Sequence, residues 1–219
     1  MMIKNNKWRC MISSAIILMP VIIGIVYWDL LPQRIVTHWG FDGAANGWSS
    51  RAFAVFGFPA IMLAGHWACI FFTASDRSNK KQTRKIMNMI FWLIPAVSFF
   101  ASAVIYAQAL GTGLNVGRVA IIFVGILFAM LGNYFPKIRQ NKTIGIRIKW
   151  TLENEENWNA THRFGGKVWL LGGIVFMFCA FLPEETFGIT FSVIMVMLVA
   201  IPVIYSYAFH KRQQSDKTG

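Results

Sequence analysis

The sequence is poor in charged residues, and above all in acidic ones. Asp and Glu number 9 of 219 residues against 21 Lys and Arg, so 14% of the chain is charged while the formal net charge is +12. Soluble globular domains have about 25% charged residues. The chain is 56% hydrophobic, which excludes intrinsic disorder, because disorder requires low hydrophobicity. An apolar, basic chain indicates a membrane protein or a protein with an acidic partner such as nucleic acid.

Cysteine is scarce as well. The chain has Cys10, Cys69 and Cys179, and no two of them form a Cys-x-x-Cys pair. Three cysteines cannot all pair within one chain, so we interpret them as small apolar packing residues. The histidines do not occur at metal-ligand spacings such as His-Glu-x-x-His. The sequence therefore predicts no metal site and no cofactor.

Long apolar runs, in contrast, are abundant. A helix of about 20 apolar residues crosses a bilayer core, and the alternation of period two that marks membrane strands is absent from these runs. No small-residue cleavage site follows the first run, so we interpret it as a retained helix. The fold class predicted is an all-α membrane protein with six transmembrane helices. The runs are Met11–Trp28, Ala52–Ala74, Ile86–Leu110, Val119–Phe135, Phe164–Leu182 and Gly188–Phe209.

The basic residues indicate an orientation in the membrane. With the amino terminus inside, every Lys and Arg except Arg34, Arg51 and Arg118 falls in a cytoplasmic segment or tail. Short cytoplasmic loops carry such an excess of Lys and Arg. We therefore expect both termini in the cytoplasm and a location in the bacterial inner membrane. Because topology accounts for the basic excess, and the inner loops are too short for a basic nucleic-acid-binding face, we expect no direct nucleic-acid binding.

The external segment 29–51 is dense in tryptophan, glycine and proline. Asp42-Gly43 and Asn46-Gly47 are turn dipeptides, and tryptophan suits the membrane–water interface. Two interpretations remain open: an aromatic-anchored turn on the bilayer surface, or a structured cap that recognises a ligand. The candidate recognition residues are Pro32, Arg34, His38, Trp39, Gly43 and Trp48.

The cytoplasmic segment 136–163 has the pattern of an amphipathic helix. Thr151 is a suitable N-cap and acidic residues follow it in the first turn, where the helix dipole favours them. We expect a helix near 152–163 that ends at Gly165-Gly166. Glu155, Trp158 and His162 would share one face of it. The helix would either dock a cytoplasmic partner or cover the inner ends of the bundle.

Both segments resemble known sequence families. The external one resembles the DUF1648 pattern L-P-x-x-I-x-x-H-W…G…G-W, carried by Leu31, Pro32, Ile35, His38, Trp39, Gly43, Gly47 and Trp48. The cytoplasmic one resembles the SdpI family of bacterial immunity proteins, which usually has Thr-Pro where this chain has Ile148-Lys149. Its signature is carried by Gly132, Asn133, Pro136, Lys137, Asn141, Gly145, Ile146, Arg147, Trp150, Thr151, Leu152, Trp158, Thr161, His162, Arg163, Gly165 and Gly166.

The resemblance implies a multi-pass protein that protects its host from a secreted toxic peptide. The best-known member of the family also signals, by holding a winged-helix repressor at the membrane when toxin is present, and the resemblance implies that this chain could do the same. On this basis the external loop would face the toxin and the cytoplasmic loop would carry the signal. The domains expected are a DUF1648-like region at 1–75, a linker with helix three at 76–118, an SdpI-like region at 119–210 and a cytoplasmic tail at 211–219.

Two other functions stay open from the residues alone. Helices one to three and four to six could form an inverted repeat, a layout common in transporters, and Thr37-His38 and Thr161-His162 fall at matching places. His66 is the ionisable residue within the spans, and such residues are functional candidates. A membrane enzyme could pair His38 with Asp42 or Asp29, or Glu155 with His162, but no nucleophile accompanies either pair. We expect no enzymatic activity.

Overall fold

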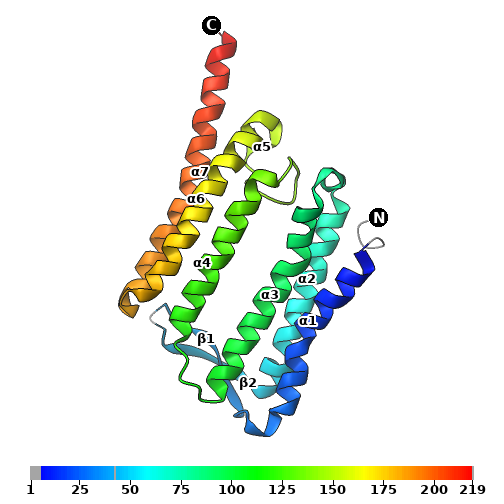
Figure 1. Ribbon diagram of the computed structural model, residues 1–219, viewed down its shortest axis with the longest axis vertical. Coiled ribbons are helices and arrows are strands. Elements are labelled where there is room, and N and C mark those ends of the chain that lie inside the picture. Colours follow the sequence, from blue (N-terminus) through cyan, green and yellow to red (C-terminus); the bar gives the residue numbers. More distant parts are fainter. Residues whose placement is uncertain (1–5, 42, 219) are drawn as a thin grey trace. The chain divides into compact units, whose positions relative to one another are not determined.

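A computed structural model describes residues 6–41 and 43–218. Within this part of the chain, six helices are long and apolar enough to cross a membrane. The predicted fold class is thereby confirmed: the chain is a multi-pass, all-α membrane protein, while the orientation of its termini stays a prediction. The six helices are α1 (Lys7–Val26), α2 (Phe58–Ser75), α3 (Arg84–Ala109), α4 (Val116–Tyr134), α6 (Glu155–Phe178) and α7 (Phe187–Thr218) (Figure 1).

Short elements connect these helices. The spans are joined by one further α-helix, two strands, a π-helical turn and several 3₁₀ turns. They are η2 (Trp28–Leu30), β1 (Arg34–Trp39), β2 (Ala45–Ser50), η3 (Phe53–Gly57), η4 (Arg77–Lys81), η5 (Phe135–Lys137), α5 (Lys149–Glu153), η6 (Cys179–Phe181) and η7 (Glu184–Thr186). The chain divides into two compact units, Met1–Ser75 with Met87–Val116, and Asp76–Ile86 with Gly117–Gly219.

In the first unit, α1, α2 and α3 pack beneath the β1–β2 hairpin. The core of this packing is formed by Leu31, Ile35, Ala54, Val55, Ile105 and Tyr106. The Tyr106 hydroxyl donates a hydrogen bond to the Pro20 carbonyl at 3.0 Å. Deeper in the unit, Ser13 Oγ donates to the Cys10 carbonyl and lies 2.8 Å from His66 Nε2. His66 Nε2 is therefore the donor in this pair, and His66 joins α2 to α1 as interhelical hydrogen bonds do in membranes.

In the second unit, α4 and α6 meet through glycines. A Cβ added at Gly166 would lie 2.7 Å from the Gly132 carbonyl oxygen and 2.8 Å from Pro136 Cδ. Two turns further along, a Cβ at Gly173 would lie 2.6 Å from the Gly125 carbonyl oxygen. Small residues let the backbones of membrane helices approach this closely. The helix pair α4–α6 therefore depends on the absence of side chains along this line.

Helix α7 is held to α6 by polar groups in an apolar setting. Pro202 has no amide hydrogen, so the Leu198 carbonyl lacks its partner within α7, and Trp169 Nε1 donates to that carbonyl at 2.9 Å. Nearer the start of α6, Asn157 Nδ2 donates to the Ser206 carbonyl, and Ser206 Oγ donates back to Asn157 Oδ1 at 2.6 Å. These bonds fix the rotation of α7 about its own axis.

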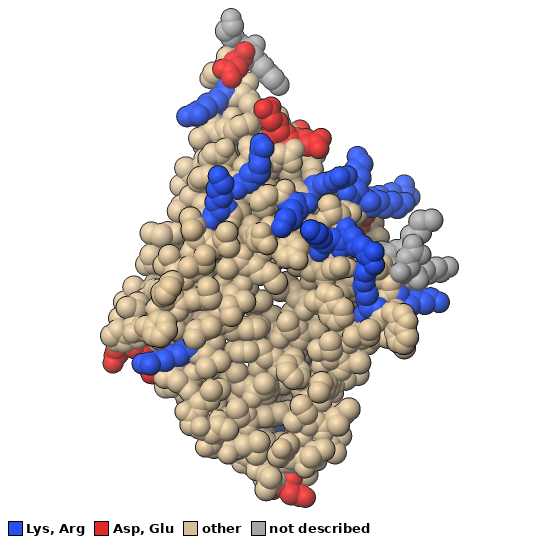
Figure 2. Space-filling model, in the orientation of Figure 1, with Lys and Arg blue, Asp and Glu red and all other residues tan. Residues whose placement is uncertain are grey.

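The charges of the second unit lie at its two ends. In Figure 2, Lys and Arg side chains gather over the end that carries the segments 76–86 and 137–149 and the tail of α7. At the other end, Arg118 forms an ion pair with Glu184 at 3.9 Å. This separation agrees with the predicted topology, in which the end with the basic cluster faces the cytoplasm.

The structure corrects the predicted helix near 152–163. The chain forms α5 over Lys149–Glu153, turns at Asn154, and then runs as α6 without a break from Glu155 into the membrane span. Asn154, not Thr151, is the N-cap of α6, and its side chain accepts from the Asn157 amide at 2.8 Å. Gly165-Gly166 lies inside α6 and does not end it. Gly166 serves the contact with α4, while Gly165 faces the side chains of Ile146 and of Pro202 in α7.

The glycine contact yields a test of the α4–α6 packing. Gly166→Ala places its methyl group against backbone atoms and the Pro136 ring, so we expect the free energy of unfolding to fall by about 1 to 3 kcal/mol. Gly65→Ala in α2 is the control, since no atom lies within 4 Å of its added Cβ, and it should be neutral or slightly stabilising. Thermal unfolding in detergent measures both. Equal midpoints for the two variants would contradict the close contact.

Candidate functional site

The external segment forms a β-hairpin, which the sequence analysis did not predict. β1 and β2 pair antiparallel, with Ile35 opposite Ser49 and His38 opposite Gly47, and the register shifts on both sides of His38. The turn is closed by a hydrogen bond from the Gly43 amide to the Gly40 carbonyl, and Gly43 has a φ of +76°, which glycine adopts without strain. The predicted turn at Asn46-Gly47 is wrong, because both residues lie in β2.

The base of the hairpin is fixed by a residue that the sequence analysis did not single out. Arg51 Nη1 donates to the carbonyls of Trp28 at 2.6 Å and Leu31 at 3.0 Å. Its guanidinium also lies 4.4 Å from the centre of the Trp28 ring, a favourable cation–π geometry. The one clue in the sequence was a basic residue on the side from which Lys and Arg are depleted, directly before an apolar run.

The candidate residues of the external segment lie along this hairpin. Ile35 is buried in the core beneath, so β1 is anchored through one face. His38 is exposed and its Nδ1 donates to Asn46 Oδ1 across the strands. Gly47 leaves room for His38, since a Cβ there would lie 2.8 Å from His38 Cβ. Of the remaining candidates, Pro32, Arg34 and Trp48 are exposed, while Trp39 and Gly43 are half-buried.

The segment 138–148 lacks regular secondary structure, and Asn141 is the centre of its turn. The side chain of Asn141 is 3% exposed. Its Nδ2 donates to the carbonyls of Arg139 and Ile144, and its Oδ1 accepts from the amides of Thr143 and Ile144. One buried amide side chain thus replaces the backbone partners that a helix would have supplied.

The segment 76–86 clamps this turn from outside. Asp76 accepts from the Lys142 amide at 3.0 Å and from the Ser78 amide and hydroxyl. Asn79 Nδ2 donates to Thr143 Oγ1 at 2.6 Å. Gln82 makes a pair of hydrogen bonds with the backbone of Arg139, as a strand would. Burial alone would raise the pKa of Asp76, but the hydrogen bonds from Ser78, Lys142 and Thr143 outweigh burial and lower it.

Trp158 and His162 of α6 support the turn from the inside. The two rings are stacked with centroids 4.1 Å apart, and both side chains are at most 1% exposed. Trp158 Nε1 donates to the Ile138 carbonyl at 2.8 Å. His162 Nε2 lies 3.0 Å from the Ile146 amide and Nδ1 lies 2.8 Å from the Trp158 carbonyl. Since an amide only donates and a carbonyl only accepts, His162 is neutral with its proton on Nδ1.

Gly145 is required where the turn crosses the His162 ring. Its φ of +109° is unfavourable for any residue with a side chain, and an added Cβ would overlap His162 Nε2. The exit of the turn is closed by Thr151, whose hydroxyl accepts from the Ile148 amide at 3.1 Å. Arg147 is exposed, and its Nη1 donates to the Lys142 carbonyl at 2.7 Å. The turn therefore presents Arg147 on a backbone that buried groups hold in place.

The other predicted residues of this segment have more peripheral places. Lys137 Nζ lies 3.4 Å from Asn133 Oδ1 and 5.0 Å from the centre of the Tyr134 ring. Trp150 stacks on His210 of α7, and Thr161 donates to Asn157. Pro136, Gly165 and Gly166 belong to the helix contacts. Arg163 has no hydrogen bond to the turn among the described residues and lies on the face of α6 that lines a pocket with α7.

Among the described residues, the catalytic pairs considered from the sequence do not form. Glu155 is exposed while His162 is buried, and both ring nitrogens of His162 are bonded to backbone. His38 is bonded to Asn46 and not to Asp29 of η2, and its other proposed partner, Asp42, lies outside the described residues. Among the residues that the structure describes, His, Cys, Asp and Glu side chains do not gather in threes at metal-binding distance.

Comparison with known proteins places both loops in sequence families. Residues 137–206 match the SdpI/YfhL protein family, and residues 15–63 match a domain of unknown function, DUF1648. Immunity protein SdpI of Bacillus subtilis (strain 168) is 23% identical over 206 residues, which cover 94% of this chain and 98% of that protein. No solved structure matches the chain.

The Asp76 clamp predicts a pH dependence. Because hydrogen bonds lower the pKa of Asp76 in the folded protein, its stabilising contribution is full above about pH 4 and is lost as the pH falls through the lowered pKa. Asp76→Asn should therefore cost about 1 to 2 kcal/mol at pH 7, and its thermal midpoint should approach that of the wild type below pH 4. Glu153→Gln, at an exposed carboxylate of α5, is the control. A difference that stays constant from pH 7 to pH 3 would contradict the clamp.

Proposed function

The chain belongs to the SdpI family, and from this premise we propose that it is an immunity protein of the bacterial inner membrane that protects its host from a secreted peptide toxin. The observation that carries the proposal is the similarity to immunity protein SdpI over 94% of the chain. The two family matches each contain one of the two ordered loops: residues 15–63 include the hairpin, and residues 137–206 include the turn around Asn141.

In this proposal the hairpin is the surface that meets the toxin. The side chain of Trp48 in β2 is 52% exposed to solvent, and that of Phe41 in the turn is 63% exposed. A peptide that attacks a membrane carries apolar side chains, for which exposed aromatic rings are suitable partners. The core beneath Ile35 and the bonds of Arg51 hold the hairpin rigid, so that binding loses little conformational entropy.

The test is survival of a toxin-sensitive bacterial strain that expresses the chain. Wild-type protein should protect, and Trp48→Ala should weaken protection by about tenfold or more, since an anchoring tryptophan contributes about 2 kcal/mol to an interface. Trp8→Ala is the matched control, because Trp8 is 73% exposed at the start of α1, away from the hairpin. Protection is compared at equal amounts of protein in the membrane.

Two outcomes would count against this proposal. Failure of the wild-type chain to improve survival, with the protein present in the membrane, overturns the immunity function. Full protection by Trp48→Ala and by His38→Ala overturns the hairpin as the toxin-facing surface while leaving immunity itself intact.

The proposal includes a signalling role for the turn around Asn141. The exposed side chains of Arg139, Lys142, Arg147 and Lys149 surround this turn, whose backbone is fixed by the buried bonds described above. A fixed basic surface favours a cytoplasmic partner with a complementary acidic face. We assign this partner to the class that the family resemblance implies, a winged-helix repressor held at the membrane when toxin is present.

Recruitment of the repressor tests the signalling role. Membranes isolated with and without toxin should retain the repressor only when toxin is added, and Arg147→Gln should reduce that retention several-fold, by about 1 kcal/mol or more. Lys80→Gln removes an exposed charge from the segment 76–86 and serves as the control. Equal retention by Arg147→Gln and wild type would remove the turn from the docking surface.

A further inference from the structure

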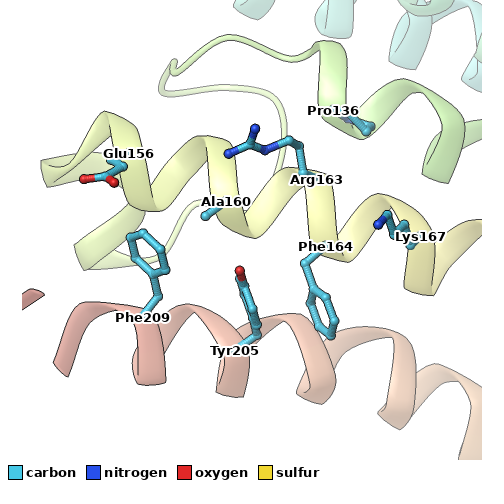
Figure 3. Close-up of a pocket in the computed structure, with 8 residues that line it drawn as sticks. All are labelled: Pro136, Glu156, Ala160, Arg163, Phe164, Lys167, Tyr205 and Phe209. Carbon is cyan, nitrogen blue, oxygen red and sulfur yellow. The ribbon is translucent and has the colours of Figure 1, made fainter. Parts of the chain in front are cut away.

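A pocket of about 590 Å³ opens on the second unit over one face of α6, with Pro136 on one side and α7 on the other (Figure 3). Arg163, Phe164 and Lys167 line it from α6, with Arg163 pointing toward Pro136, and Tyr205 and Phe209 line it from α7. None of these five side chains hydrogen-bonds the turn around Asn141 within the part of the chain that the structure describes. Neither the immunity proposal nor the signalling proposal uses it.

The positive charges of this pocket are available to a ligand. Arg163 and Lys167 are exposed and one helical turn apart on α6. Within the described residues, neither cation has a salt-bridge partner at 4 Å or less. The one acidic residue of the pocket, Glu156, accepts a hydrogen bond from Gln213 at 2.6 Å. It lies two turns before Arg163, about 10 Å along the axis, so positive potential is concentrated at the Arg163–Lys167 end.

The wall opposite these cations is aromatic. Phe164 and Tyr205 stack with ring centroids 4.2 Å apart, and Phe209 continues the row from Tyr205 at 6.4 Å. The pocket thus places two free cations beside a continuous apolar surface. A small soluble anion would use only the first of these features, whereas an amphiphile would use both.

The place of the pocket along α6 identifies the kind of amphiphile. Lys167 is followed by an uncharged run that reaches Pro183, so Arg163 and Lys167 stand where the apolar part of the span begins. Basic residues at this depth extend their charged ends to the lipid headgroups. Basic pockets between membrane helices on the cytoplasmic side bind anionic phospholipid headgroups.

We propose that this pocket binds an anionic phospholipid, with its phosphate between Arg163 and Lys167 and an acyl chain along Phe164 and Tyr205. The bound lipid would lie over α6 beside the Tyr205 face of α7 and would neutralise the two cations. The site would hold a lipid of the inner leaflet as a specific ligand, independently of toxin or repressor.

Native mass spectrometry of the detergent-solubilised full chain tests this proposal. The protein is titrated with phosphatidylglycerol and, separately, with phosphatidylcholine. We expect the wild type to prefer phosphatidylglycerol by about tenfold, because each interfacial basic residue contributes measurably to the attraction of anionic lipid. The double variant Arg163→Gln/Lys167→Gln should lose this preference. Lys142→Gln/Lys149→Gln, which removes the same charge from outside the pocket, should keep it.

Further arms separate the proposal from its rivals. Arg163→Lys keeps the charge and should keep most of the preference for phosphatidylglycerol, which would show that a substitution at this position does not by itself abolish lipid binding.

Equal losses in the two double variants would show attraction by net charge alone and would overturn the site. Displacement of phosphatidylglycerol by millimolar glycerol phosphate would identify a soluble phosphate as the ligand and overturn the lipid. Loss of repressor recruitment in Arg163→Gln/Lys167→Gln with the lipid preference unchanged would assign the pocket to an acidic protein segment instead.

Discussion

The second unit depends on hydrogen bonds from buried side chains to a backbone that has no secondary structure. Between η5 and α5 the backbone makes no helical hydrogen bonds. Each buried amide or carbonyl there needs another hydrogen-bond partner, because a buried group without one destabilises the folded protein. Asn141, Trp158 and His162 supply these partners from positions that are at most 3% exposed. They can do so because α6 passes directly beneath the turn, and α6 is held there by its glycine contact with α4. The shape of the turn is therefore a consequence of how two membrane helices approach one another.

The sequence was sufficient for the six membrane helices and insufficient for what joins them. A helix satisfies all of its backbone groups internally, which the hydrocarbon core requires, so run length alone located the spans. The hairpin depends on contacts that no local pattern shows. β2 contains Asn46 and Gly47, which are poor strand formers and whose dipeptide predicts a turn. They fit the strand because Gly47 makes room for His38 and Asn46 Oδ1 accepts a hydrogen bond from His38 Nδ1. Pairing across the hairpin outweighs their local preference.

The candidate site shows a similar limit. The family signature named residues of the cytoplasmic segment, but not their partners in 76–86, since Asp76 and Asn79 precede their contacts Lys142 and Thr143 by more than 60 positions. Residue type was also ambiguous at Gly165-Gly166. Two glycines after an amphipathic stretch usually end a helix, yet here Gly166 admits the α4 backbone and Gly165 admits the Pro202 side chain of α7. Only the position of a neighbouring helix distinguishes these two uses of glycine.

The cytoplasmic segment divides its residues between two tasks. Buried Trp158, His162 and Asn141 determine where the backbone of the turn lies, while exposed Arg139 and Arg147 determine which charges the turn presents on its surface. Removal of the His162 ring would leave the Ile146 amide without its partner and would displace the turn together with every group on it. A loss of partner binding in such a variant would report on folding of the turn and not on recognition. Substitutions of the exposed basic side chains do report on partner recognition, because these side chains can change while the buried hydrogen bonds of the turn remain in place.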